Sequence, residues 1–283
     1  MPTGFRRLRL MTFLLSLAFG VCPTLAFADH SWGSYHWARS SNPFTVKLGD
    51  NLSNTWDPYL SAASSDWSQS TVLNTTIVAG GTAPKKCRAS AGRVEVCATT
   101  YGNNGWLGVA QIWISGSHIT RGTVKLNDTY FNTAKYNTSE WRNLVMCQEV
   151  GHTLGLDHQD ENFNNTNLNT CMDYTNDPST NQHPNQHDYE QLIAIYGHDD
   201  STTTAFQSVQ NGRGQARART TLPDPDSDEP AVLGTGQWGK LIRSTNHGRT
   251  ELYELDLGRG HKILTHVIWA EPGEEPGSRD GRR

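Results

Sequence analysis

The chain has little of what a membrane-embedded or nucleic-acid-binding protein needs. Only 18% of its 283 residues are charged, and the formal net charge is −4, so no general excess of positive charge favours a nucleic acid partner. The mean hydropathy of −0.60 excludes a body embedded in a membrane. Nine tryptophans are too many for a fully disordered chain. A globular protein with one sizeable domain and additional segments is therefore expected.

Residues 1–28 predict a secretory signal peptide. Three arginines precede an apolar stretch at 10–21 that is too short to span a bilayer. Residues 26–28 (Ala-Phe-Ala) fit the small-x-small pattern of a cleavage site, so Asp29 is the expected first residue of the mature chain. A retained anchor helix is the alternative. We therefore expect a secreted protein, extracellular or periplasmic, that has no membrane contact after cleavage.

Cysteine is also scarce, with five residues in the whole chain. Removal of the signal peptide takes Cys22 away and leaves Cys87, Cys97, Cys147 and Cys171. An even number in an exported protein favours two disulfides, for which three pairings exist. We favour 87–97 with 147–171, because the first pair closes a short loop that contains Ala91-Gly92. Free buried thiols are the alternative.

Hydrophobic patterning predicts a mixture of strands and helices in the first two thirds of the mature chain. Strands are expected at 44–49, 72–78, 94–98, 106–115 and 119–126, and helices at 52–69, from about 139 and at 188–196. The helix near residue 139 has two candidate N-caps. One is Asn137, which would form a capping box with Glu140, and the other is Ser139. Residues 156–181 have the composition of a loop.

The composition changes after residue 198. Residues 199–236 contain one aromatic residue, a basic cluster and then an acidic, proline-rich cluster, which is typical of a flexible linker. Strand character returns at 241–242, 252–257 and 263–269. Residues 237–283 are therefore expected to form a small β-rich C-terminal segment.

One segment carries a pattern of metal chemistry. It reads Cys-Gln-Glu-Val-Gly-His-Thr-Leu-Gly-Leu-Asp-His over residues 147–158. Positions i and i+4 of a helix are only about 40° apart, so Gln148 and His152 can face one ion. Glu149 lies beside that face, where it can deprotonate a metal-activated water. Gly155 permits a sharp turn, after which His158 can return as a third ligand.

This segment resembles the metzincin pattern H-E-x-x-H-x-x-G-x-x-H, with Gln148 in place of the first histidine. Residues 171–174 (Cys-Met-Asp-Tyr) resemble the metzincin Met-turn, and residues 187–197 are similar to the closing helix of matrixin catalytic domains. The resemblance covers about residues 29–198. It implies an α+β fold with a twisted mixed sheet, an active-site helix and a small C-terminal subdomain that contains the Met-turn.

The resemblance also implies a function. The chain would be a matrixin-like zinc metalloendopeptidase that acts on a protein or peptide substrate. We expect the enzyme to be a monomer. His152 and His158 would hold Zn²⁺, together with Gln148 through its amide oxygen, a weaker donor than imidazole. Glu149 would act as the general base. One alternative is that another residue of the chain takes the place of Gln148 as a zinc ligand. A weakly active or inactive metzincin-fold pseudoenzyme that acts as a secreted binding protein is another.

Two residues of the Met-turn would support this site. Met172 would pack beneath the metal. Tyr174 matches the Met-x-Tyr arrangement of astacins and serralysins, which implies an extra ligand or an oxyanion donor; a packed loop tyrosine is the alternative. A Cys147–Cys171 bridge would tie the active-site helix to this turn.

Other residues are weaker candidates. Trp106, Leu107 and Val109 could belong to an edge strand that pairs with an extended substrate, or to the core. His118 is interpreted as a surface residue. A calcium site, with a solvated acidic loop as the alternative, could be formed by Asp157, Asp160, Glu161, Asp173 and Asp177.

Overall fold

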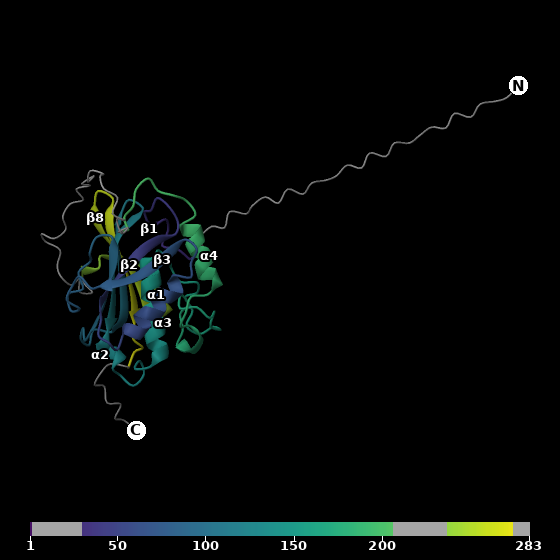
Figure 1. Cartoon of the computed structure of the whole chain (residues 1–283). Coiled ribbons are helices and arrows are strands. Elements are labelled where there is room, and N and C mark those ends of the chain that lie inside the picture. Colours follow the sequence, from purple (N-terminus) through teal and green to yellow (C-terminus); the bar gives the residue numbers. More distant parts are fainter. Residues whose placement is uncertain (2–29, 206–236, 274–283) are drawn as a thin grey trace.

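The computed structural model describes Met1, residues 30–205 and residues 237–273 (Figure 1). Apart from Met1, the predicted signal peptide lies outside the described residues, as do residues 206–236 of the predicted linker. Residues 199–205, predicted as the beginning of that linker, contact the segment around Ala38: the hydroxyl of Thr204 accepts a hydrogen bond from the Ala38 N–H at 2.9 Å.

A mixed nine-stranded sheet forms the centre of an α+β fold. Eight strands follow the order β3-β2-β4-β6-β5-β9-β8-β7, and the short β1 pairs with β6. The first four in this order are parallel to one another, whereas β5, β9, β8 and β7 are antiparallel to their neighbours. The strands are β1 (His36–Trp37), β2 (Phe44–Asn51), β3 (Leu73–Ala79), β4 (Arg93–Thr99), β5 (Trp106–Ser115), β6 (His118–Asn127), β7 (Lys240–Thr245), β8 (Thr250–Gly258) and β9 (His261–Trp269).

Helices cover one face of this sheet, where α1 and α3 lie side by side (Figure 1). The helical elements are α1 (Asp57–Trp67), α2 (Asp128–Phe131), α3 (Ser139–Thr153), α4 (Gln186–Ile195) and the single turns η1 (Pro178–Thr180) and η3 (Asn246–Gly248). Both predicted N-caps of α3 are wrong, because Thr138 takes this role and its hydroxyl accepts a hydrogen bond from the Trp141 N–H. The Asn137 side chain instead accepts a hydrogen bond from Arg142 at 2.9 Å, which removes it from competition for the cap.

Two fully buried tryptophans fix the position of α3. The indole N–H of Trp67, in α1, donates to the Cys147 carbonyl at 3.1 Å, and that of Trp37, in β1, donates to the Thr153 carbonyl at 2.9 Å. Buried N–H groups without a partner are costly, so each bond favours one position of the helix. The helix with the metal-binding pattern is therefore held from both α1 and β1.

The C-terminal strands extend the main sheet. Strand β9 pairs with β5 from the Trp106–Trp269 pair to the Ser115–His261 pair, so β5 lies between β6 and β9. Of the two interpretations of Trp106, Leu107 and Val109, the free edge is therefore wrong and the core is confirmed, because all three are buried. The physical reason lies in both strands. Without β9, the main-chain N–H and C=O groups on one side of β5 would be unpaired, and β9 is an apolar strand that is not stable without a partner.

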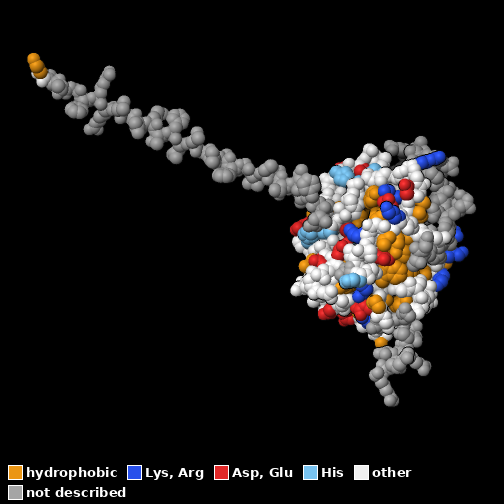
Figure 2. Space-filling view, turned by 180° about the vertical axis from the view of Figure 1, so that it is seen from behind, with side chains coloured by type: hydrophobic (Ala, Val, Ile, Leu, Met, Phe, Trp, Pro, Cys, Tyr) orange, Lys and Arg blue, Asp and Glu red, His pale blue; other side chains and the backbone are white. Residues whose placement is uncertain are grey.

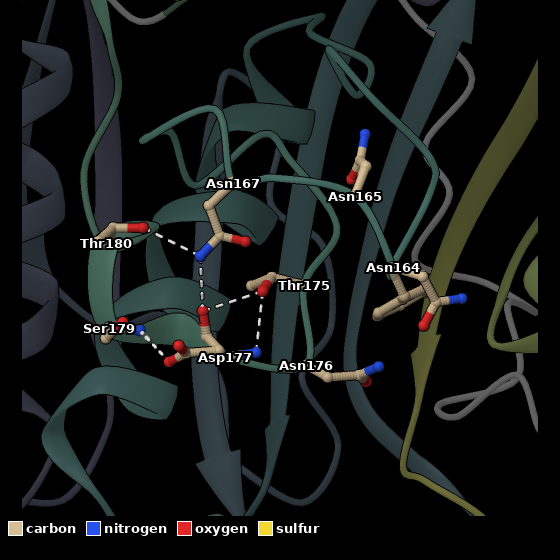
Figure 3. A pocket seen from close by; sticks show the side chains of 9 residues that line it. Asn164, Asn165, Asn167, Thr175, Asn176, Asp177, Ser179 and Thr180 are labelled. Atoms are coloured by element: carbon tan, nitrogen blue, oxygen red, sulfur yellow. Dashed lines mark hydrogen bonds between the residues drawn. The ribbon is translucent and has the colours of Figure 1, made fainter.

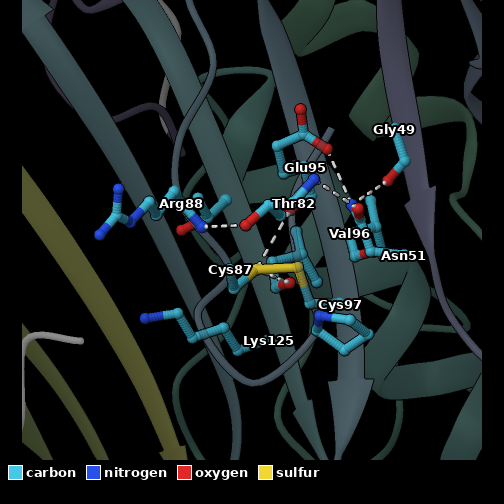
Figure 4. The surroundings of a disulfide bond; sticks show 12 residues. Gly49, Asn51, Thr82, Cys87, Arg88, Glu95, Val96, Cys97 and Lys125 are labelled. Carbon is cyan, nitrogen blue, oxygen red and sulfur yellow. Dashed lines mark hydrogen bonds between the residues drawn. A yellow bond between two sulfur atoms is a disulfide. The ribbon is translucent and has the colours of Figure 1, made fainter. Parts of the chain in front are cut away.

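Both disulfides are present in the favoured pairing, Cys87–Cys97 and Cys147–Cys171, each with Cα atoms 5.9 Å apart. The first bridge lies beside a polar network at the ends of β2 and β4 (Figure 4). There the Asn51 amide nitrogen donates to a Glu95 carboxylate oxygen at 2.7 Å. The second bridge joins α3 to the segment that contains Met172.

Removal of the second bridge is expected to destabilise the protein substantially. The Cys147→Ala/Cys171→Ala variant should lose about 3 kcal/mol of unfolding free energy, because the bridge spans 24 residues and closing such a loop restricts the unfolded chain. Denaturant unfolding monitored by tryptophan fluorescence measures this loss. The matched Cys87→Ala/Cys97→Ala variant, with a span of 10 residues, should lose less. Equal stability of wild type and the 147/171 variant would contradict the prediction.

The surface mixes charges of both signs. Figure 2 shows Lys and Arg side chains and Asp and Glu side chains spread over one face, with hydrophobic side chains gathered between them. Leu241 and Ile242 of β7 and Leu257 of β8 are among the exposed large hydrophobic residues. None of the helices in the described ranges combines the length and apolar character that a bilayer crossing requires.

Candidate metal centre

The predicted turn after α3 brings two histidines together. Gly155 has a φ of +98°, and a Cβ there would lie 2.8 Å from the Tyr35 carbonyl oxygen, so both its backbone conformation and its surroundings require glycine. Beyond this turn His158 comes back toward α3. Its Nε2 lies 3.1 Å from the Nε2 of His152, as expected for two ligands of one ion.

A third histidine, His266 in β9, completes the cluster. Ligand nitrogens of His152, His158 and His266 all lie within 4.8 Å of one another. The His266 ring centroid is 4.1 Å from that of His152 and 4.8 Å from that of His158. Sequence reasoning missed this residue. The available signal was a histidine inside an apolar strand pattern, in a chain whose metal-binding motif lacks one imidazole.

Each of the three rings has an oxygen atom near its Nδ1. These oxygens are the Leu156 carbonyl at 2.9 Å from His152, the Asp157 carboxylate at 3.3 Å from His158, and the Glu149 carboxylate at 3.4 Å from His266. The contacts of His152 and His266 are hydrogen bonds, and such a bond is typical of histidines that bind metals through the other nitrogen, because it fixes the tautomer and the ring orientation.

Burial keeps the three imidazoles neutral. It lowers the pKa of His152 and of His266 to about 3, and the pKa of His158 falls well below its usual range for the same reason. Neutral imidazole is the form that binds metal ions. Burial also raises the pKa of Glu149 to about 8. A cation held by the histidines would favour the ionised carboxylate of Glu149, because a nearby opposite charge stabilises the charged form.

Glu149 lies where α3 faces β5. One carboxylate oxygen is near His266, and the other, Oε1, has no hydrogen-bond partner in the described part of the chain. A Cβ at Gly108 of β5 would lie 2.6 Å from that oxygen, so Gly108 makes room for the carboxylate. Sequence reasoning missed Gly108 too; a glycine inside an apolar strand was the signal.

Gln148 is buried, and its amide group has a fixed orientation. The amide nitrogen donates to the Cys171 carbonyl at 2.8 Å. The amide oxygen is buried without a hydrogen-bond partner among the described residues. An acceptor left in this state is costly, and coordination of a cation would satisfy it. The chemistry of this donor set, three neutral imidazoles with the Glu149 carboxylate nearby, fits zinc.

Of the two supporting residues predicted from the Met-turn, Met172 packs against α3 and Tyr174 contacts the histidines. Met172 is fully buried beneath α3, where a Cβ at Gly151 would lie 2.7 Å from its sulfur. The Tyr174 ring centroid is 3.9 Å from that of His158. Its hydroxyl is 3.2 Å from Nε2 of His266, so Tyr174 is part of the cluster as well as of the loop.

Of the acidic residues considered for calcium, Asp157 and Glu161 lie close together, but the third donor within 4.8 Å of both is the imidazole of His158, which calcium does not prefer. Asp157 is paired with Arg243 at 2.6 Å, and Asp177 caps η1 by accepting a hydrogen bond from the Ser179 N–H at 3.1 Å. A pocket of about 370 Å³ in this loop is lined mainly by amide and hydroxyl side chains, with Asp177 as its carboxylate (Figure 3). The structure gives the calcium prediction no support.

Comparison with known proteins gives matches among solved structures. No protein-family model matches the chain, and no curated protein matches it. Among solved structures it is similar to high choriolytic enzyme 1, a hatching enzyme zinc-protease from Oryzias latipes (medaka fish), with 11% identity and a TM-score of 0.33. The match covers 59% of this chain and 96% of that chain. Because a similarity of this size carries no information about activity, function is inferred below from the chain's own residues.

Proposed function

We propose that the chain is a secreted zinc-dependent metalloendopeptidase of the matrixin-like metzincin type. One observation carries this proposal: three buried imidazoles meet beside a buried carboxylate. The Nε2 atoms of His152 and His158 are 3.1 Å apart, His266 completes the group within 4.8 Å, and Glu149 lies next to it. Three protein ligands with a further position open are typical of catalytic zinc sites.

His152, His158 and His266 would hold the ion, and the amide oxygen of Gln148 is a further donor. When bound, zinc supplies a Lewis acid that activates water and polarises a peptide carbonyl. Glu149 accepts a proton at its carboxylate and passes it to the leaving amine. The hydroxyl of Tyr174 donates a hydrogen bond to the negative charge that develops on the substrate.

The setting of this enzyme would be extracellular or periplasmic. The predicted signal peptide supports export, and the two disulfides fit an oxidising compartment. We further propose a protein or peptide substrate and a monomeric chain.

Metal content tests this proposal directly. Zinc-replete wild-type protein is expected to contain one equivalent of zinc more than the His152→Ala/His158→Ala variant, as measured by elemental analysis after gel filtration. Cleavage of an unfolded protein substrate should stop when a chelator is added and return with zinc. The same zinc content in wild type and variant would contradict the proposal.

A second function is favoured by the closure of the site. Glu149 and His152 have exposed fractions of 0%, and β9 occupies the side of β5 with which an extended substrate would pair. A chain that remains in this state binds zinc without cleaving peptides. This observation favours the pseudoenzyme that acts as a secreted binding protein.

Severing the chain within residues 206–236 separates the two functions. An inserted cleavage site for a specific protease in this segment lets residues 237–283 dissociate after cutting, without deleting a strand that the protein needs for folding. For the peptidase, cutting should raise activity at least about tenfold, because β5 becomes free to pair with a substrate. It should also weaken zinc binding, because His266 leaves with β9.

Two controls complete the comparison. Addition of the protease to wild type without the inserted site should leave activity unchanged. If the cut protein is freed of residues 237–283, holds zinc at saturating concentration and still cleaves no substrate, the pseudoenzyme is the correct function.

A further inference from the structure

A second group of histidines lies elsewhere in the fold and shares no residue with the centre described above. His36 is in β1, His118 is the first residue of β6, and His198 and Asp200 follow α4. Three separate parts of the chain therefore contribute to it. No sequence motif predicts a role for this group. Among its members, only His118 is interpreted from the sequence, as a surface residue.

The imidazole nitrogens of this group converge on one carboxylate oxygen. Oδ1 of Asp200 lies 3.4 Å from Nε2 of His36, 3.3 Å from Nε2 of His118 and 3.7 Å from Nε2 of His198. The Nε2 atoms of His36 and His198 are themselves only 3.3 Å apart. Two imidazole nitrogens this close cannot both carry a proton without repulsion, so at least one of them presents its lone pair to the group.

The orientation of two members is fixed from outside the group. Nδ1 of His36 lies 2.7 Å from the Ser34 carbonyl oxygen, and since a carbonyl can only accept, Nδ1 carries a proton and Nε2 of the neutral ring presents its lone pair. The second carboxylate oxygen of Asp200 accepts hydrogen bonds from the Arg39 guanidinium at 2.7 Å and from its backbone N–H at 3.2 Å. Oδ1 is thereby turned toward the histidines. Outer partners of this kind are characteristic of metal ligands.

We propose that His36, His198 and Asp200 bind a second divalent transition-metal ion, for which zinc is the best fit. Ligand atoms of these three residues lie within 4.8 Å of one another, and His118 contacts Asp200 beside them. Two imidazoles and one carboxylate supply three positions of a tetrahedral zinc site, and this mixture of nitrogen and oxygen donors suits zinc better than calcium or magnesium. The group shares no residue with the first centre, so the ion is independent of the proposed peptidase chemistry.

Access and position agree with this proposal. The side chains of His36 and Asp200 are largely buried, whereas 32% of the His118 side chain and 53% of the His198 side chain are exposed, which gives an ion a route from solvent. An ion there would fasten the segment after α4 to β1. That segment leads through Thr204 to residue 205, the last residue of this described range.

The test uses the full chain with the first centre removed. In the His152→Ala/His158→Ala background, titration with zinc chloride against a chromophoric chelator is expected to show one remaining equivalent of bound zinc. Addition of His198→Ala should weaken that binding at least tenfold. His183→Ala is the matched control, since its ring is 60% exposed and also pairs with an aspartate, Asp66, and it should leave binding unchanged.

A second measurement avoids the background variant. Starting from wild type, His198→Ala should lower the zinc content by one equivalent and should remove part of the zinc-dependent rise in melting temperature. Because the His198 ring is largely exposed, this variant should keep its fold. If His198→Ala changes neither zinc content nor the zinc-dependent melting temperature, the group is only an ion-pair cluster around Asp200, and the proposal is wrong.

Discussion

Glu149→Gln is expected to lower kcat/KM for peptide cleavage by about 10²–10⁴-fold in the cut protein, with its fold and its bound zinc retained. The reason is that glutamine keeps the size of the side chain but cannot accept the proton that general-base catalysis must remove. The carboxylate is buried and one of its oxygens has no hydrogen-bond partner among the described residues. This position costs folding free energy, and a catalytic role explains it. Single-turnover cleavage of a fluorogenic peptide measures the change.

The matched control is Glu190→Gln, which makes the same change at an exposed position of α4 and should leave activity unaltered. Removal of the buried charge should leave unfolding temperature the same or slightly higher, because burial disfavours the ionised form. If Glu149→Gln cleaves peptide at the rate of the unchanged cut protein, then Glu149 is not the general base and the proposed mechanism is wrong.

His266→Ala in the intact chain is expected to raise the zinc dissociation constant of the first centre by about 100-fold or more. Loss of an outer partner alone costs about 10–100-fold in affinity, and this substitution removes an imidazole from the group itself. Gln148→Leu, which removes an amide oxygen from a side chain of similar size, should have a smaller effect, about tenfold. Chelator competition gives both values in a His198→Ala background, where the second proposed site does not contribute.

Two further variants test whether these effects come from loss of a ligand. His261→Ala removes a histidine from the other end of β9 and should leave zinc affinity unchanged, which separates a ligand effect from a general weakening of the strand. Gln148→His should strengthen zinc binding if position 148 faces the ion. Should Gln148→Leu abolish binding while His266→Ala has no effect, the third ligand is the amide, as the sequence pattern predicts, and His266 is a neighbour only.

Local patterns predicted the parts of the site that are local in sequence. The helix through Glu149, the turn at Gly155 and the approach of His158 depend on spacing within about ten residues, and the backbone of this segment alone brings these side chains together. The cap of α3 was missed for a related reason. Neighbouring Asn137, Thr138 and Ser139 are all good caps by type, and only the structure shows that Asn137 is engaged by Arg142 and that Thr138 accepts the capping hydrogen bond.

What is distant in sequence could not be predicted in the same way. The approach of His266 to α3 depends on the pairing of β9 with β5, and an alternating apolar pattern indicates that a strand exists without indicating its partner. The same limit applies to the edge predicted at Trp106. Strand β5 looks like a free edge when only its own segment is considered. In the structure it is covered by β9, which follows it by about 150 residues in the chain.

The pairing of β9 with β5 has a thermodynamic consequence. One strand both places the His266 imidazole in the cluster and covers the surface that a substrate would need. Under the proposed ligand set, zinc affinity and strand docking are reciprocally coupled: the ion holds the strand in place by the same free energy by which the strand tightens the ion. Free zinc concentration would then set the fraction of molecules that are open, and a substrate able to displace β9 would loosen the metal as it enters.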